Sequence, residues 1–147
     1  SMGNVESFPP PGRIIFSAYK SEGECFRGDV TYTTIVENIG NGLDIRTGVF
    51  SAPRSGLYLL SFSASTASSC SGVVTGPIIQ IQINGAEDFA FSGDTTYGLL
   101  SYTWLSHLKM NDKVNAKIYE EPNGDFFTFG LFADSHYKIV FNGIQLK

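Results

Sequence analysis

The chain has 147 residues and a formal net charge of −4 at pH 7, with 14% aromatic residues, 16% charged residues and 16 glycines. A single domain of this length buries roughly 70% of its unfolded surface, so we expect a stable core. An acidic chain without a run of lysine and arginine is a poor match for nucleic acid, and no stretch of eighteen apolar residues predicts a membrane span.

The first twelve residues predict a linker. They have no hydrophobic periodicity and include Phe8-Pro9-Pro10-Pro11-Gly12, a proline run that favours an extended, semi-rigid backbone. Ser1-Met2 is typical of an expression-tag remnant, so it carries no information about a natural targeting signal. We expect residues 1–12 to be tag remnant and linker, and residues 13–147 to form the globular domain.

The first part of the domain predicts short strands separated by turns. Residues 13–19 are apolar and β-prone, whereas residues 20–28 predict a polar loop. Asn41-Gly42 supplies two residues that accept positive φ, and an apolar strand follows at residues 48–50.

The longest predicted strand, residues 57–66, is apolar on both faces near its start. Side chains alternate along a strand, so one face carries Tyr58, Leu60, Phe62 and Ala64. The opposite face begins with Leu57 and Leu59 and continues to Ser61. A strand that is apolar on both faces must be covered twice, and in a short chain the second cover is expected to be a partner subunit. We therefore predict a subunit interface at Leu57, Leu59 and Ser61.

The second part of the domain continues the β pattern. Residues 78–83 alternate isoleucine with glutamine, and Asn84-Gly85 predicts a turn into a loop at residues 85–96. Further strands are expected at residues 97–108, 113–118, 126–132 and 137–146. No segment shows sustained helical periodicity, and turn signals recur about every 8 to 12 residues. This pattern indicates an all-β sandwich or jelly roll.

Residues 32–62 resemble the signature of the C1q globular-head family. The matching positions are Tyr32, Asn38, Leu43, Phe50, Gly56, Tyr58 and Phe62. Tyr32 and Leu60 stand where the family usually has phenylalanine, and both keep apolar bulk. Further blocks resemble the family at residues 108–114, 130–134 and 141–146. The resemblance covers nearly all of residues 13–147.

This resemblance implies a ten-stranded jelly-roll β-sandwich of the C1q/tumour-necrosis-factor type. It implies a secreted, extracellular domain that forms a homotrimer and binds a protein or glycan ligand without catalysis, with innate immunity among the family's roles. Two alternatives remain open, a tumour-necrosis-factor-like signalling ligand for a cell-surface receptor and a carbohydrate-binding lectin. No nucleic-acid partner, no membrane insertion and no required cofactor are expected.

Ligand contacts are expected in loops at the ends of the jelly roll. The candidate residues are Phe89, Phe91, Tyr97, Tyr119, Glu120 and Glu121. The resemblance also implies calcium as a candidate ligand of the 85–96 loop, where Asp88 and Asp94 could supply carboxylate oxygens. An exposed acidic loop is the alternative explanation of these carboxylates.

The remaining chemically active residue types give no catalytic site. Asp134-Ser135-His136 holds the residue types of a hydrolase triad, but neighbouring residues on a strand or turn point in different directions, so no enzyme is expected. Cys25 and Cys70 lie in predicted loops. In an extracellular domain they could form a disulfide, and two free thiols are the equal alternative.

Overall fold

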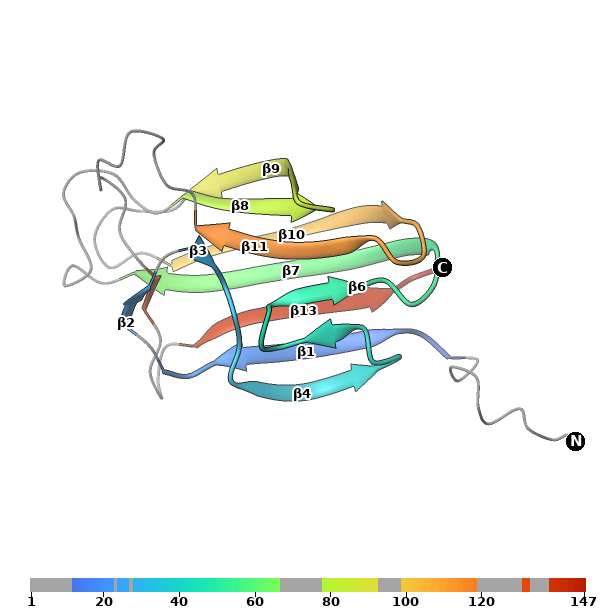
Figure 1. The fold of residues 1–147 in the computed structure, drawn as a ribbon, viewed down its shortest axis with the longest axis horizontal. Helices are drawn as coiled ribbons and strands as arrows, with labels where there is room; N and C mark the ends of the chain where they lie inside the picture. The colour runs from blue at the N-terminus through green and yellow to red at the C-terminus, as the bar shows by residue number, and fades with distance from the viewer. Residues whose placement is uncertain are drawn as a thin grey trace, which may run out of the picture.

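The computed structural model describes residues 12–22, 24–26, 28–66, 78–92, 99–118, 131–132 and 138–147. This part of the chain holds thirteen strands in two antiparallel sheets (Figure 1). The jelly-roll sandwich expected from the sequence is confirmed. The strand number exceeds ten because several strands are only two or three residues long. Among the described residues no helix is long and apolar enough to cross a membrane.

The first sheet has the order β2-β12-β7-β13-β1-β4, with β10 paired to the free side of β7. The central strand β7 therefore contacts β10 along one edge, and β13 and then β12 along the other. The strands of this sheet are β1 (Ile15–Lys20), β2 (Glu24–Phe26), β4 (Thr34–Ile39), β7 (Gly56–Thr66), β10 (Leu99–Leu108), β12 (Leu131–Phe132) and β13 (Ile139–Gln145).

The second sheet has the order β5-β6-β11-β8-β9, with β3 paired to β11. Its strands are β3 (Gly28–Asp29), β5 (Leu43–Asp44), β6 (Val49–Ser51), β8 (Ile78–Ile83), β9 (Ala86–Ser92) and β11 (Lys113–Ile118). Strands β8 and β11 have the bounds that the sequence predicted.

Two predicted loops are wrong in the structure. Residues 85–96 were expected to be a loop, but Ala86–Ser92 forms β9. Asn84 and Gly85 both have positive φ, 54° and 83°, so they make a two-residue hairpin turn and the return strand begins at once. Residues 20–28 were also expected to be a loop, but Glu24–Phe26 forms β2, which pairs with the short strand β12.

The core lies between the sheets and is rich in aromatic side chains. All four predicted core residues of β7 are buried: Tyr58, Leu60, Phe62 and Ala64. Phe16 joins the two sheets, since its ring stacks on Phe50 at 4.3 Å and meets Phe141 edge-on at 4.8 Å. A Cβ at Gly143 would lie 2.1 Å from the Phe16 ring, so this position of β13 needs glycine.

Candidate interaction surface

The outer face of the first sheet carries a row of apolar side chains that crosses five strands. Direct cross-strand pairs connect β4 to β1, β1 to β13, β13 to β7, and β7 to β10. Cross-strand partners project from the same face of a sheet. The residues of this apolar row are, in spatial order, Ile39, Ile15, Ile144, Leu59 and Leu105. Leu105 is 59% exposed and the other four are half-buried, so none belongs to the core.

Polar residues flank the apolar row on the same face. Two residues further along each strand, Ser17 pairs with Asn142, Asn142 with Ser61, and Ser61 with Thr103. The hydroxyl of Ser17 donates to Asn142 Oδ1 at 2.5 Å. A shallow groove of about 370 Å³ runs where the apolar and polar rows meet. The outer face therefore combines an apolar contact strip with neighbouring hydrogen-bonding groups.

The predicted interface residues lie on this face. Leu59 is in the apolar row and Ser61 is in the polar row. Leu57 lies two residues from Leu59 on the side away from Ser61, and it pairs with His107. Strand patterns in the sequence do not place Ile15, Leu105 and Ile144 on the same surface. Each lies on a recognisable strand, but only the pairing register places them beside Leu59.

An aromatic cluster closes one edge of the sandwich. Strands β9 and β10 are the last strands of their sheets, and they contribute Phe89 and Phe91, and Tyr102 and Trp104, respectively. Ring centroids lie 5.1 Å apart for Phe89–Tyr102 and Phe89–Trp104, and 5.2 Å apart for Phe91–Tyr102. Tyr102 is 44% exposed. The cluster therefore presents aromatic surface at this edge of the sandwich, on the strand β10 that carries Leu105 on its opposite face.

The cluster changes the interpretation of two predicted ligand contacts. Phe89 and Phe91 were expected in an end loop, but they lie half-buried on β9, packed against β10 side chains. Their alternation with Asp88 and Ala90 is a strand pattern, and it was the available sequence signal. The other candidates, Tyr97, Tyr119, Glu120 and Glu121, lie outside the described residues.

The outer face of the second sheet is polar and its side chains bond to one another. Asn115 Nδ2 donates to Gln82 Oε1 at 3.2 Å, Gln82 Nε2 donates to Gln80 Oε1 at 2.6 Å, and Gln80 Nε2 donates to Glu87 Oε1 at 2.7 Å. We call these four side chains the amide row. A chain of bonds that satisfies its own donors suits a face in contact with water.

One member of each candidate pair, for the metal site and for the disulfide, lies outside the described residues. Asp88 is exposed on β9, and Asp94 lies outside the described residues. In the described part of the chain no three side chains of histidine, cysteine, aspartate or glutamate form a group that could hold a metal ion. Cys25 is in β2, and Cys70 and the Asp134-Ser135-His136 segment are outside the described residues. Calcium binding and the disulfide remain predictions.

The fold and sequence match known proteins as follows. The family model of the C1q domain matches residues 15–145. A search of curated protein sequences gave no significant match. Among solved structures, the globular domain of zebrafish Complement 1qA protein has a TM-score of 0.65 at 18% identity and covers 92% of this chain and 98% of that one.

Two further structures share the fold. Murine APRIL at pH 5.0 has a TM-score of 0.64 at 16% identity, with 92% of this chain and 100% of that chain covered. Pika GITRL has a TM-score of 0.57 at 9% identity, with 91% and 97% covered. Because the C1q family model matches nearly the whole globular domain, this chain belongs to the C1q domain family.

Proposed function

We propose that this chain is a secreted, non-enzymatic binding domain that assembles as a homotrimer through the outer face of its first sheet. The observation that carries the proposal is the apolar row of Ile39, Ile15, Ile144, Leu59 and Leu105, next to an aromatic edge. The amide row on the opposite face of the molecule offers no comparable apolar surface.

The energetics favour covering the apolar row with protein. Moving a leucine or isoleucine side chain from full exposure to full burial contributes about 1.5 to 3 kcal/mol. The row residues are half-buried or exposed, so a part of that free energy is still available to an interface. Contiguous exposed apolar surface of this kind marks a protein interaction site.

The positions of the row and the aromatic edge support a ring. The row lies on the face of the first sheet, and the cluster of Phe89, Phe91, Tyr102 and Trp104 lies on its β9–β10 edge. An edge of one subunit against the face of the next is a heterologous contact, which generates a closed ring when the rotation closes. Membership in the C1q domain family supports three subunits as the closed number.

The ligand of such an assembly would be a protein or a glycan. Three copies of one site raise the apparent affinity above that of a single copy through effective concentration, without any new contact. The second candidate function is that of a receptor-binding signalling ligand. It is supported by the fold shared with APRIL and GITRL, and that likeness extends to the fold alone.

Sedimentation velocity tests the assembly. We expect a trimer at micromolar concentration and a monomer for Leu59→Asp, because the substitution would bury an unpaired carboxylate in the interface. Gln82→Asp is the control, since it places the same charge on the outer face of the second sheet. A monomeric wild-type protein, or equal dissociation of the two variants, would refute the proposed interface. A receptor screen with wild-type and Leu59→Asp protein then tests whether binding depends on valency.

A further inference from the structure

Six residues gather at one end of the sandwich and combine positive charge with exposed apolar side chains. We call this the basal surface, and its residues are Arg13, Arg54, Lys109, Met110, Leu146 and Lys147. The start of β1, the end of β13 and the β10–β11 connection lie at this same end (Figure 1). With Arg54 of the β6–β7 connection, four chain segments far apart in sequence therefore build it.

Hydrogen bonds hold these segments together around the β6–β7 connection. The N–H of Met110 donates to Ser55 Oγ at 2.8 Å, and Gln145 Nε2 donates to the carbonyl of Ser55 at 3.2 Å. The N–H of Leu57 donates to the carbonyl of Lys147 at 2.5 Å. The β10–β11 turn and the last residues of β13 are thus fixed to the same loop.

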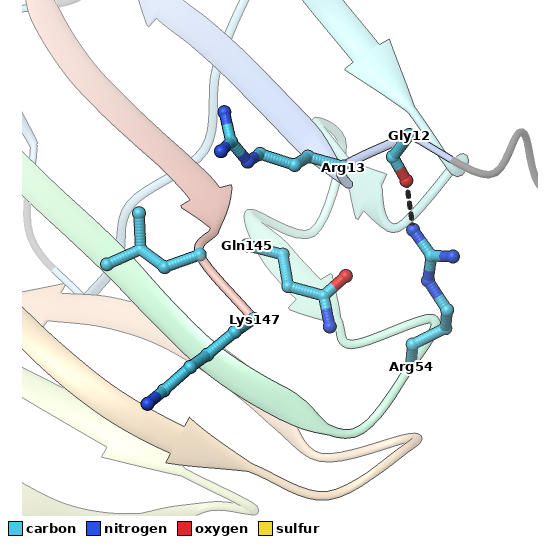
Figure 2. A pocket seen from close by; sticks show the side chains of 6 residues that line it. Gly12, Arg13, Arg54, Gln145 and Lys147 are labelled. Atoms are coloured by element: carbon cyan, nitrogen blue, oxygen red, sulfur yellow. Dashed lines mark hydrogen bonds between the residues drawn. The ribbon is translucent and has the colours of Figure 1, made fainter.

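The basal surface contains a pocket of about 570 Å³ lined by Gly12, Arg13, Arg54, Gln145, Leu146 and Lys147. None of the lining residues that the structure describes is acidic. Figure 2 shows the guanidinium of Arg54 donating to the carbonyl of Gly12, while the Arg13 and Lys147 side chains extend away from Arg54. The Nε of Arg54 is buried without a hydrogen-bond partner. The cations are therefore spread over the end of the molecule and do not converge on one point.

The acidic residue closest in sequence to this surface, Asp112, already accepts two hydrogen bonds. Asp112 Oδ1 accepts from Asn84 Nδ2 at 3.0 Å, and Asp112 Oδ2 accepts from the N–H of Lys109 at 2.8 Å. These bonds tie the carboxylate to the turn. Asp112 stays ionised, but the four cations Arg13, Arg54, Lys109 and Lys147 outnumber this one carboxylate. The basal surface is therefore positive in a chain whose formal net charge is −4.

Two large apolar side chains project among these cations. Met110 is 59% exposed at the tip of the β10–β11 turn, and Leu146 is 40% exposed beside Lys147. Basic residues combined with exposed apolar side chains are the composition of protein surfaces that lie on an anionic membrane. A soluble polyanion would use the cations but would leave Met110 and Leu146 in water.

We propose that the basal surface docks on the headgroups of anionic lipids, with Met110 and Leu146 entering the headgroup region. The spread of the cations matches several separate headgroups. Such peripheral docking requires no membrane-spanning segment. It uses residues outside the apolar row and the aromatic edge, so it stands whether or not the domain assembles as proposed above.

Vesicle co-sedimentation tests the proposal. We expect the protein to bind vesicles of phosphatidylcholine and phosphatidylserine mixed three to one, to ignore pure phosphatidylcholine, and to dissociate as salt is raised. Each basic residue near an anionic surface contributes about fivefold in affinity, so Lys109→Glu with Lys147→Glu should weaken binding by about 25-fold or more. Met110→Ser should weaken it by about fivefold, since the side chain no longer enters the interface.

Matched variants test whether vesicle binding depends on the basal surface itself or only on the overall number of basic and apolar residues. Arg46→Glu with Lys138→Glu makes the same change in charge at two exposed positions away from the basal surface, and Val36→Ser removes an apolar side chain that is 61% exposed on β4. Both controls should bind like wild type. Equal loss in the controls, binding to pure phosphatidylcholine, or no binding at all would overturn the proposal. Binding to dextran sulfate but not to vesicles would replace it with a polyanion site.

Discussion

The two outer faces of the sandwich use the same alternation of inward and outward side chains, yet they present opposite chemistry. On the first sheet, outward positions in one register are aliphatic from β4 to β10. On the second sheet, outward positions of β11, β8 and β9 form the amide row. The inward positions of both sheets are buried and apolar. The difference indicates which face is the better candidate for contact with a partner.

Hydrogen-bond satisfaction explains the contrast. The amides of Gln80, Gln82 and Asn115 bond to one another and to Glu87, so water can cover this face at little cost. The apolar row has no such alternative, because aliphatic groups gain free energy only by leaving water. The larger sheet is therefore the face that we expect to be covered, and the smaller sheet is the face that we expect to remain in water.

The largest effect is expected where the apolar row is most exposed. Leu105→Asp should weaken self-association by at least 100-fold, about 3 kcal/mol, because the carboxylate would be buried without a partner. Since Leu105 is 59% exposed in the single chain, folding of the monomer should be unaffected. Sedimentation equilibrium measures the first effect, and urea unfolding at concentrations below dissociation measures the second. Strong destabilisation of the monomer would show that Leu105 is a folding residue instead.

In the core between the two faces, one substitution should increase the stability of the fold. The hydroxyl of Tyr32 is buried without a hydrogen-bond partner, and burial raises the pKa of this side chain far above its usual range. Tyr32→Phe removes that unsatisfied group and keeps the ring that stacks on Phe141, so it should raise the free energy of unfolding by about 1 to 2 kcal/mol. Urea unfolding provides the measurement. A loss of stability would mean that the hydroxyl has a partner in solution.

Gln82, at the centre of the amide row, tests how much these hydrogen bonds stabilise the fold. Gln82→Leu removes one donor and one acceptor and should lower the free energy of unfolding by about 1 kcal/mol. It also adds an apolar side chain to the second face, so association beyond the proposed trimer is expected in sedimentation. Lys117→Leu is the control, because it adds a leucine to the same face outside the row. Equal destabilisation by the two changes would show that the row contributes nothing.

The smallest effect is expected at the β10–β11 turn and depends on pH. Hydrogen bonds from the Asn84 side chain and the Lys109 N–H hold the pKa of Asp112 below its usual range. The ionised carboxylate therefore stabilises the fold above the pKa of an unfolded aspartate, about 3.9, and this contribution is lost as pH falls through the lower pKa of the folded state. Asp112→Asn should lower the melting temperature slightly at pH 7, with the difference vanishing in strong acid. A difference of the same size at every pH would contradict this role of the Asp112 carboxylate.

The sequence by itself determined the fold class and the family. Alternation of isoleucine and glutamine gave the bounds of β8, and the family spacing of Tyr32, Asn38, Phe50 and Tyr58 indicated a C1q-type jelly roll. The inner face of β7 was also predictable, because alternation assigns its side chains to two faces without reference to any other strand. These features depend on residues close together in the chain.

Only the tertiary structure determined the candidate sites. Ile15, Leu59, Leu105 and Ile144 are separated by tens of residues, and the pairing register that aligns them depends on long-range hydrogen bonds. The aromatic edge requires β9 to lie beside β10 of the other sheet. The sequence did not predict β9, because its segment is acidic and directly follows a hairpin turn. The basal surface needs both ends of the domain to meet two of its turns. A strand pattern specifies which way a side chain points, whereas its neighbours are decided by which strands pair.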